Sequence, residues 1–397
     1  MKEIDDLFEN FEINLTNRGM PADECYSLLT NNRILIYGAG NAGIVLYERM
    51  QKLGFEIQGF LDNRGSIYGE RYKTLPIYSN KEAVGILDQA ESWLIIVALF
   101  DIVSYPTIKE QLLNQFDKFV NLSVYYFAEF RSCRDLFSLQ ILPRFSVYLG
   151  EEVEKLLKNR EYILEVYNLL TDELSKRTYL ELLNFYMASC EAPHTIFPYE
   201  EHYFAYDLYK KDEDEVFVDC GAYDGDTLDF FIHNQTDFKR YIAIEADKMN
   251  FEKLQNKSES RGWNDKIMCI NAFLSDKKDT VCFSSRGTSF SGNDFTEEGQ
   301  NVETCTLDEL VYEYAPTFIK INLEGADLDA VRGGERTIRE YAPLLAIQGH
   351  HRMEHLWEIV ETIQNYLKGQ YKFYLRNYKG ISEFTFYAIP KGRTKDE

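Results

Sequence analysis

The chain has 397 residues, a length that predicts two to three domains with cores of their own at roughly 150 residues per domain. Hydrophobic residues make up 45% and charged residues 27%, which excludes a disordered or fibrous chain. The net charge of -22 disfavours general attraction to nucleic acid or to an anionic membrane surface.

The N-terminal segment gives no indication of export. Met1–Asn10 is acidic and lacks an apolar core, and the longest purely apolar run, Trp93–Phe100, is less than half a membrane span. The seven cysteines form no C-x-x-C pair and no zinc-finger spacing, so we expect reduced thiols and no structural metal site. These features predict a cytoplasmic protein without membrane insertion.

A glycine-rich turn between two apolar strands is the first predicted functional feature. The strand Arg33–Tyr37 leads into the turn GAGNAG and a helix, and a second strand, Phe55–Leu61, follows. The turn glycines and the acid that ends the second strand are Gly38, Gly40, Gly43 and Asp62. The 19 residues from Gly43 to Asp62 (43 to 62) are typical of a nucleotide-binding βαβ unit, in which the acid binds ribose hydroxyls. Tight packing of strand on helix is the alternative explanation of the glycines.

Amphipathic helices are predicted next, over Glu151–Leu170 and Leu174–Met187, where leucine and aromatic side chains recur at helical spacing. We interpret these stripes as packing surfaces rather than as a cofactor site. Pro193–Tyr209, with two prolines and six aromatic residues, is expected to be an ordered surface strap. The acidic run Asp212–Glu215 is expected to be a solvated loop.

A second βαβ unit begins at the strand Val216–Val218. The acids and glycines of its turn are Asp219, Gly221, Asp224 and Gly225. A helical segment and the strand Tyr241–Ile244 follow, and this strand ends in Glu245. The spacing from Gly225 to Glu245 (225 to 245) is 20 residues, so the second unit is also predicted to bind a nucleotide.

Strands and helices continue to alternate after this unit. The predicted strands are Ile267–Ala272, Val281–Phe283, Phe318–Leu323 and Leu344–Gln348. Thr306-Leu-Asp-Glu309 is a capping box that opens a helix. Two alternating segments, Tyr371–Asn377 and Glu383–Ile389, flank a Lys379-Gly380 turn and predict an antiparallel hairpin. The fold class is therefore α/β, with two Rossmann-like, doubly wound domains at 1–125 and 211–397 joined by a helical connector at 126–210.

The order of the strands places a candidate site. In a doubly wound sheet, ligands bind beyond the carboxyl ends of the strands where the strand order reverses. If the strand ending at Val218 lies beside Phe318–Leu323, then Asp219–Gly225 faces Asn322–Asp327 across that crevice. His350 and His351 follow the next strand, so we expect them on the substrate side of the crevice.

Three strings in this half of the chain resemble the signatures of the FkbM family of methyltransferases. They are VFVDCGAYDGDT, IKINLEGADLDAVRGGERTI and PLLAIQGHHRMEHLWEI. The resemblance covers roughly residues 195–390, and LLTDELSKRTYLELLNFYMAS resembles the region before this domain in longer members. It implies a class I methyltransferase sheet that ends in an antiparallel pair, and transfer of a methyl group from S-adenosylmethionine (AdoMet) to a hydroxyl group without a metal. It also implies an acceptor that is a sugar or a polyketide.

The resemblance assigns residues position by position. It implies that Asp219, Gly221, Asp224 and Gly225 surround the methionine end of AdoMet and that Glu245 holds the ribose hydroxyls. Asn271, Ala272, Ser275 and Asp276 are then expected to border the adenine. Lys320, Glu324 and Gly325 match the second signature, and His351, Leu356 and Trp357 match the third.

The chain departs from the family pattern at two places. Asn322 stands where the family more often has an aspartate, and Gly349-His350 replaces an apolar residue and a tyrosine. If the aspartate orients the substrate hydroxyl or the AdoMet ammonium, Asn322 keeps the hydrogen bonding and loses the charge. The departure therefore bears on activity and on substrate range.

The reaction requires a base close to the acceptor oxygen, because a sugar hydroxyl is a poor nucleophile. His351 and Glu324 are the candidate bases, and neutral imidazole suits the role at pH 7. Asn322 and Lys320 complete the candidate catalytic set. The alternative is that His351 is a hydrogen-bonded histidine at a strand end and Glu324 a turn carboxylate. His350 and His355 are expected to be surface or supporting residues, and no spacing fixes a metal site.

Two features leave alternatives open. Ser284–Ser291 is either a substrate loop, whose Arg286 would pair with a phosphate or carboxylate, or an ordinary polar turn. The N-terminal turn resembles the nucleotide-binding domain attached to several enzymes of bacterial surface-sugar assembly. NAD, a nucleotide sugar or no ligand at all fits it, and a scaffold or a homodimer surface is a further alternative. The segment Tyr68–Tyr72 (YGERY) lacks the lysine of a dehydrogenase motif.

The prediction is an AdoMet-dependent O-methyltransferase that acts on a sugar hydroxyl in polysaccharide or glycoconjugate biosynthesis. Its expected partner is a small-molecule or glycan acceptor and not nucleic acid. One rival is a non-catalytic nucleotide-sugar or dinucleotide binding protein with a degenerate methyltransferase domain, which Asn322 favours slightly. The other is an NAD-dependent sugar oxidoreductase, which the missing lysine disfavours.

Overall fold

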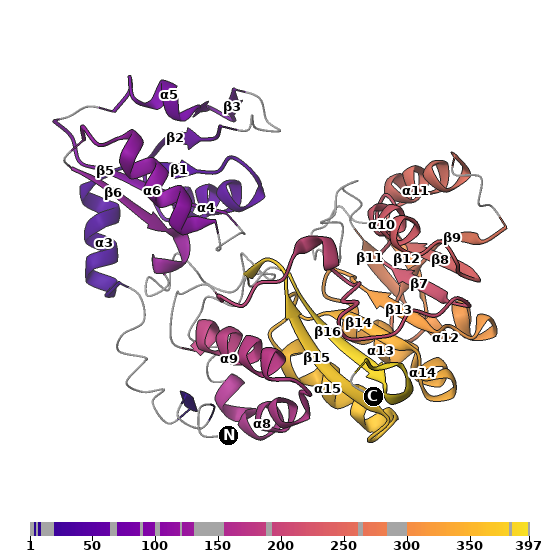
Figure 1. Cartoon of the computed structure of the whole chain (residues 1–397). Helices are drawn as coiled ribbons and strands as arrows, with labels where there is room; N and C mark the ends of the chain where they lie inside the picture. The colour runs from indigo at the N-terminus through magenta and orange to yellow at the C-terminus, as the bar shows by residue number, and fades with distance from the viewer. Residues whose placement is uncertain are drawn as a thin grey trace. The chain divides into compact units, whose positions relative to one another are not determined.

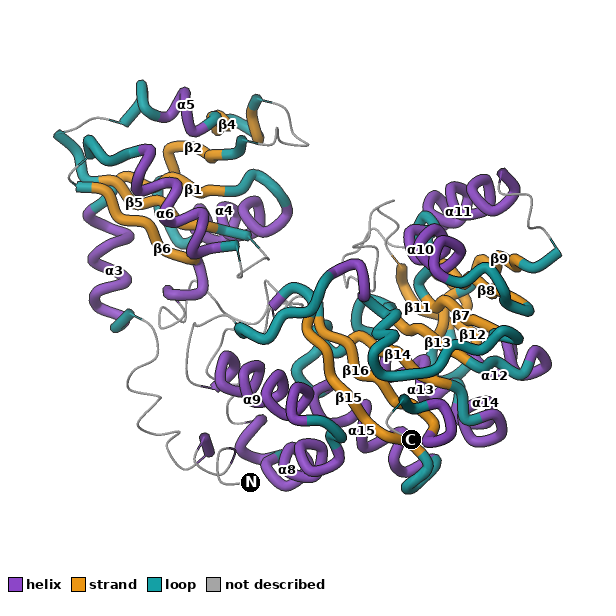
Figure 2. Tube along the Cα trace, viewed as in Figure 1, coloured by secondary structure: helices purple, strands orange, loops and turns teal. Residues whose placement is uncertain are grey.

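A computed structural model describes residues 4, 7–8, 20–63, 70–87, 90–99, 104–119, 121–130, 155–187, 193–260, 265–283, 300–380 and 383–395. The chain divides into two compact units, each with helices flanking its strands (Figures 1 and 2). One unit comprises Met1–Arg160, Leu180–His194 and Lys379–Ser382, and the other comprises Glu161–Tyr179, Thr195–Tyr378 and Glu383–Glu397. Tyr68, Gly69 and the whole of Ser284–Ser291, with Arg286, lie outside the described residues.

The first unit contains a six-stranded sheet in the order β3-β4-β2-β1-β5-β6. The strands are β1 (Arg33–Tyr37), β2 (Ile57–Leu61), β3 (Arg71–Tyr72), β4 (Leu75–Tyr78), β5 (Trp93–Val97) and β6 (Leu122–Tyr126). All neighbours pair in parallel except β3 and β4. The helices are α3 (Ala22–Asn31), α4 (Asn41–Lys52), α5 (Asn80–Ala83) and α6 (Tyr105–Gln115), with a 3-10 turn, η1 (Phe127–Phe130). The completely buried β5 shows why this sheet reads as apolar runs, since parallel strands are covered on both faces.

The second unit is built on a seven-stranded sheet in the order β15-β16-β14-β13-β7-β8-β9. The strands are β7 (Val216–Cys220), β8 (Arg240–Glu245), β9 (Ile267–Asn271), β13 (Phe318–Ile321), β14 (Leu344–Gln348), β15 (Tyr371–Asn377) and β16 (Phe384–Pro390). Five strands are parallel, and β16 pairs antiparallel with both β14 and β15. A separate three-stranded sheet joins β10 (Phe273–Leu274), β12 (Gln300–Cys305) and β11 (Thr280–Phe283) in that order.

The helices from α8 onward follow, with α9 divided between the two units at Leu180. They are α8 (Arg160–Leu169), α9 (Glu173–Met187), α10 (Asp226–Asn234), α11 (Lys248–Ser260), α12 (Leu307–Val311), α13 (Asp327–Gly333), α14 (Glu335–Tyr341) and α15 (His355–Tyr366). Short 3-10 turns occur at η3 (Tyr199–Glu201), η4 (Tyr312–Tyr314) and η6 (Lys391–Arg393). In Figure 1, α10 and α11 lie on one side of β7 and β8, and α12, α13 and α14 lie on the other.

Stacked aromatic rings form the core beside the candidate site. Phe217 on β7 lies within 5.1 Å of the Tyr241 ring, and within 4.8 Å of Phe231 and of Phe318, between ring centroids. Phe204, from the segment before β7, packs against the same group at 5.7 Å from Phe217. This packing fixes the strap Pro193–Tyr209 against the sheet and so brings its side chains to the ends of the central strands.

The predicted α/β class is confirmed, with parallel-dominated sheets and a C-terminal antiparallel pair. The predicted neighbours are confirmed as well, because β7 pairs with β13 and places Asp219 opposite Lys320. The capping box of Thr306 and Glu309 opens α12 as expected. The divisions after residues 125 and 210 stay predictions. Within the described residues, no helix is both long and apolar enough to cross a membrane.

Candidate functional site

The turn between β7 and α10 can be made only with glycine at its start. Gly221 has φ +80°, and a Cβ there would lie 1.9 Å from the carbonyl oxygen of Asn322. Gly225, with φ +85°, begins α10. The backbone of this turn therefore runs directly against the residue that follows β13, at the point where the strand order reverses.

A buried ion pair between Lys320 and Asp219 supports this turn. Lys320 Nζ lies 2.7 Å from Asp219 Oδ1 and donates a 2.7 Å hydrogen bond to the carbonyl oxygen of Gly221. The second carboxylate oxygen of Asp219 accepts a 2.5 Å bond from Tyr241 Oη. Burial lowers the pKa of Lys320, but Asp219 outweighs it and the net pKa is raised, so the amine stays charged. The structure thus brings two predicted site residues together as a support of the turn.

Glu245 ends β8 and reaches back to the same turn. Its carboxylate accepts 2.8 Å hydrogen bonds from the backbone N–H groups of Tyr223 and Asp247. Burial raises the pKa of Glu245 to about 7, even though both backbone donors favour the charged form. Each oxygen retains a lone pair, so the carboxylate can accept hydrogen bonds from two hydroxyls of a ligand.

The predicted adenine-side residues lie around the end of β9. Asn271 pairs with Glu245 across the strands, and its Nδ2 donates to the carbonyl oxygen of Glu245 at 2.8 Å. The backbone N–H of Ala272 donates to the same oxygen at 3.2 Å. Asp276 lies farther along, after β10, and is exposed, with Ser275 Oγ at 3.3 Å. Asp224 lies 3.7 Å from Lys257 Nζ on α11.

A histidine and an aspartate form a buried dyad at the end of β14. His351 Nδ1 lies 2.7 Å from Asp327 Oδ2, and Asp327 is held by the backbone N–H groups of Leu323 and Gly325 at 2.9 and 3.1 Å. Since the carboxylate can only accept, we place the ring proton on Nδ1, which leaves the lone pair on Nε2. His351 Nε2 is buried and has no hydrogen-bond partner among the described residues.

Opposing effects set the charge of this dyad. Burial lowers the pKa of His351, but the ion pair and hydrogen bond with Asp327, together with Glu324, outweigh it and raise the net pKa above its ordinary value. Burial conversely raises the pKa of Asp327, while His351 holds it well below its usual range. The arrangement is that of a base that is stabilised after it takes a proton.

Glu324, the other candidate base, lies at the edge of this dyad. It adopts φ +52°, a conformation rare for a residue with a side chain. Its Oε1 is 3.8 Å from His351 Nε2, and 22% of its side chain is exposed. The Glu324 carboxylate is therefore close enough to His351 Nε2 to stabilise a positive charge on the ring.

Asn322, the predicted catalytic amide, belongs to a cluster of uncharged polar groups that borders the carboxylate of Glu383, whose Oε2 lies 3.5 Å from Gln348 Nε2 and 3.7 Å from His202 Nε2. Its Nδ2 donates to Tyr203 Oη at 2.8 Å, and Oδ1 is buried without a partner among the described residues. Gln348 Nε2 donates to the same Tyr203 oxygen at 2.9 Å and lies 2.5 Å from His202 Nε2. The rings of His202 and Tyr203 stack with centroids 3.8 Å apart. We refer to Tyr203, His202, Asn322 and Gln348 as the amide cluster.

Of the two remaining histidines of this region, His355 is buried and His350 is half-buried, so both have the supporting role considered for them rather than a surface role. Burial lowers the pKa of His350 well below its ordinary value and that of His355 to about 4. His350 Nδ1 lies 3.2 Å from Gln348 Oε1. Both rings are therefore neutral at pH 7 and support their surroundings. In the described part of the chain, no group of three histidine, cysteine or acidic residues is arranged to hold a metal ion.

Comparison with known proteins bears on the same residues. Residues 219–377 match the profile of the Methyltransferase FkbM domain family. This part of the chain is an FkbM methyltransferase domain. The crystal structure of methyltransferase FkbM from Methylobacillus flagellatus KT matches with a TM-score of 0.75 and 22% identity, covering 97% of this chain and 99% of that one. At this identity the match shows a shared fold.

Two further solved structures match a smaller share of the chain. An rRNA methylase from Streptococcus thermophilus has 16% identity and a TM-score of 0.30, covering 47% of this chain and 92% of its own. Precorrin-6y C5,15-methyltransferase from Geobacter metallireducens GS-15 has 11% identity and a TM-score of 0.28, covering 44% and 78%. No curated protein matches the chain.

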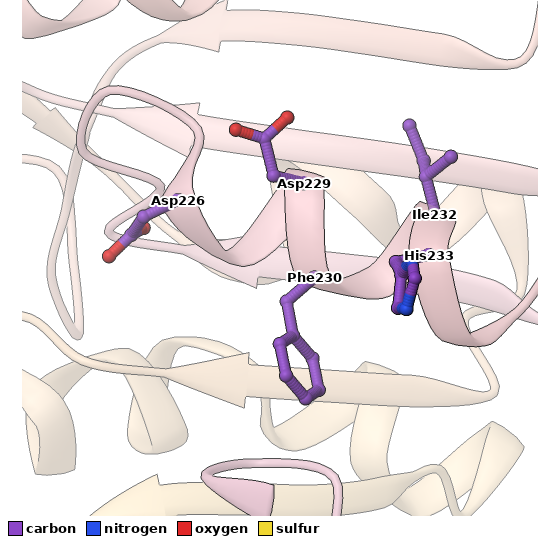
Figure 3. A pocket seen from close by; sticks show the side chains of 5 residues that line it. All are labelled: Asp226, Asp229, Phe230, Ile232 and His233. Atoms are coloured by element: carbon purple, nitrogen blue, oxygen red, sulfur yellow. The ribbon is translucent and has the colours of Figure 1, made fainter. Parts of the chain in front are cut away.

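A shallow hollow borders α10 of the FkbM domain, one turn beyond the glycine loop. It is lined by Asp226, Asp229, Phe230, Ile232 and His233. Figure 3 shows Phe230 and His233 on one side of the helix and Asp229 and Ile232 on the other, as helical spacing requires. The residues singled out from the sequence line the ends of β7, β8, β13 and β14 instead.

Some residues of the site were not singled out from the sequence. Tyr203, Gln348 and Tyr241 were taken as parts of a strap and of apolar strands, and Asp327 was placed at the crevice without a role. Asp327 is 24 residues from His351, and no local pattern links them. The one available signal was a polar residue, Gln348, that ends an otherwise apolar strand.

The N-terminal unit repeats one detail of the FkbM domain. The backbone N–H of Ala39, in the turn after β1, donates to Asp62 Oδ2 at 3.0 Å, as that of Tyr223 does to Glu245. A Cβ on Gly43 would lie 1.8 Å from the carbonyl oxygen of Gly38, and Gly40 caps α4. Asp62, after β2, is therefore hydrogen-bonded to the turn that holds Gly38 and Gly40, and Gly43, in the first turn of α4, is required for packing.

Proposed function

We propose that the chain is an AdoMet-dependent O-methyltransferase and that its acceptor is a sugar hydroxyl in polysaccharide or glycoconjugate assembly. The observation that carries the proposal is the buried His351–Asp327 dyad, which follows β14, two strands from β7 in the sheet, and whose Nε2 has no hydrogen-bond partner among the described residues. A dyad of this kind can remove the proton from a hydroxyl that does not ionise on its own at neutral pH. The sugar is what the family resemblance implies.

The residues around the turn fit AdoMet. Gly221 leaves a cradle that a Cβ would fill, and Glu245 presents a carboxylate for two ribose hydroxyls. Asn271 and Ala272 would border the adenine, and Asp219 with Lys320 would hold the turn in place. When bound, AdoMet would supply a methyl group on a positively charged sulfur, and the sulfur would be the leaving group when the acceptor oxygen attacks the methyl carbon in line.

The chain's own groups handle the proton. His351 Nε2 accepts it from the acceptor hydroxyl as the new bond to oxygen forms, and Nδ1–H continues to donate to Asp327. The imidazolium then lies between Asp327 and Glu324, two carboxylates that stabilise it. Product release returns the proton to water. Burial of the dyad keeps solvent from competing for the base.

Two measurements test the proposal. Calorimetric titration of AdoMet into the full chain should show micromolar binding that Glu245→Ala weakens about 100-fold. Transfer of labelled methyl from AdoMet to hydroxylated acceptors should then give an alkali-stable methyl ether, and His351→Gln should reduce the rate without changing AdoMet affinity. Failure of AdoMet to bind, or an alkali-labile ester as the product, would overturn the proposal.

A further inference from the structure

The amide cluster has an unfilled hydrogen-bonding position next to the glycine turn. Asn322 Nδ2 donates to Tyr203 Oη, and Asn322 Oδ1 is buried without a partner among the described residues. Turning the amide over would let Tyr203 donate to Oδ1 and would leave Nδ2 as the unpartnered atom. In either orientation one buried amide atom of Asn322 lacks a partner in the described part of the chain, which is costly unless a ligand supplies it.

Two sets of contacts connect Asn322 to the cofactor turn and to the base. The carbonyl oxygen of Asn322 is the atom that a Cβ on Gly221 would meet at 1.9 Å. The next residue, Leu323, donates its backbone N–H to Asp327, the partner of His351. His351 Nε2 is a second buried atom without a partner among the described residues, and its ring is linked through Asp327 to the loop that carries Asn322.

The groups that fix Asn322 are held rigidly. Tyr203 has φ +67°, a strained conformation for a tyrosine, and its ring stacks on His202. Gln348 donates to Tyr203 Oη and so prevents the phenol from rotating away. Burial lowers the pKa of His202 to about 3, so its ring is neutral at pH 7. Lys320 Nζ lies 5.0 Å over the Tyr203 ring, but it is paired with Asp219.

Resting on the proposed function, we propose that Asn322, held by Tyr203 and Gln348, binds a second hydroxyl of the acceptor next to the one that His351 deprotonates. The acceptor is then a neutral compound with adjacent hydroxyl groups. Asn322 provides hydrogen bonding without a charge, so a cationic amine gains no ion pair from it and a phosphate gains no cation. The Glu383 carboxylate, 3.5 Å from Gln348 Nε2, further disfavours a phosphate. Asn322 is a binding residue here, and Tyr203 and Gln348 are positioning residues.

The test uses the full chain saturated with S-adenosylhomocysteine, the demethylated product. Binding of methyl glycosides of neutral hexoses, of an amino sugar and of a sugar phosphate is measured by calorimetry, and methyl transfer from AdoMet is measured with the same compounds. Neutral glycosides should bind at least about tenfold more tightly than the charged ones, and Tyr203→Phe should weaken them about tenfold, the effect of one lost hydrogen bond in a dry site. Asn322→Asp should shift the preference toward the amino sugar.

Tyr371→Phe is the matched control, because it also removes one buried tyrosine hydrogen bond, to the carbonyl oxygen of Pro343. It should leave glycoside affinity unchanged. Affinity for S-adenosylhomocysteine should be the same in all these variants. Equal loss in Tyr203→Phe and Tyr371→Phe, preference of the wild type for a charged sugar, or no binding of any neutral glycoside would each overturn the inference. Failure of S-adenosylhomocysteine itself to bind would instead count against the proposed function.

Discussion

At the scale of single residues, the acid at the end of β8 changes its charge near neutral pH. Burial raises the pKa of Glu245 to about 7, and the proposed ribose contacts require the carboxylate form. Since the ligand binds the deprotonated group, affinity should rise as pH rises through this pKa. AdoMet affinity should therefore increase about tenfold between about pH 6 and about pH 8. Calorimetry at both pH values measures the change.

The control for this prediction is Glu245→Gln, which keeps the shape and removes the titration. Its affinity should be weak and nearly independent of pH over the same interval. A wild type and a glutamine variant with the same pH dependence would show that another group titrates and that Glu245 does not.

The second prediction at this scale concerns Asp327. Asp327→Asn removes the carboxylate that raises the pKa of His351, so the imidazolium is less stable and the base is weaker. The turnover number should fall about 10²- to 10⁴-fold, with AdoMet affinity retained. Since His351 must be deprotonated to act, the rate rises with pH through its pKa. That rise should move to lower pH in Asp327→Asn.

A change of the same kind two residues away is the control. Asp329→Asn lies on α13 as well, and Asp329 contacts Arg332 at 3.8 Å rather than a histidine. Its rate and pH profile should match the wild type. If Asp329→Asn and Asp327→Asn slow the reaction equally, the dyad has no special part in proton transfer.

At the scale of elements, the central strands are the most predictable part of the molecule. β7, β13 and β14 are buried on both faces, and so they are mostly apolar apart from the ion-paired Asp219 and Lys320 and the terminal Gln348, with a recognisable glycine or acidic loop after each. β12, with the sequence QNVETC, was missed because it pairs only in a small separate sheet and needs no apolar face. The predicted strand Ile267–Ala272 is shorter than expected and is followed by β10.

The same reasoning explains which site residues were predictable. Residues after strand ends, such as Glu245 and His351, follow from the topology of a doubly wound sheet. The amide cluster depends on the path of the strap over the sheet, which puts Tyr203 against a residue 119 positions later. Such a contact is set by packing of aromatic rings and has no periodic signature in the sequence.

The turn after β7 gives a prediction at this scale. Gly221→Ala should lower the free energy of unfolding by at least about 2 kcal/mol, since the left-handed backbone is strained and the Cβ meets the Asn322 carbonyl. It should also weaken AdoMet binding, because the turn must move. Gly369 has φ +73° and open space around it, so Gly369→Ala should cost only about 1 kcal/mol. Urea unfolding and calorimetry measure both effects, and equal results for the two variants would contradict the steric argument.

At the scale of the whole molecule, the two compact units share the same arrangement of a glycine turn and an acid. Each has a parallel sheet, a glycine turn after one strand, and an acid after the next strand that accepts a backbone N–H from the turn. The chain carries a net charge of -22, and its proposed ligand AdoMet carries a positively charged sulfonium. Because the two turns are so similar, with spacings of 19 and 20 residues, the sequence does not show which of them binds AdoMet.

The residues around each acid predict that only one of the two turns binds AdoMet. Glu245 lies beside Asn271, and the turn it holds is supported by the Lys320 ion pair and lies next to Asn322. The residues assigned to AdoMet surround Glu245 and not Asp62, so Asp62→Ala should change AdoMet affinity less than about twofold, whereas Glu245→Ala should weaken it about 100-fold through the loss of two hydrogen bonds to a carboxylate. Calorimetry on the full chain should also give one AdoMet per chain. Two sites per chain, or a loss of affinity in Asp62→Ala as large as in Glu245→Ala, would mean that the N-terminal turn takes part in binding the methyl donor.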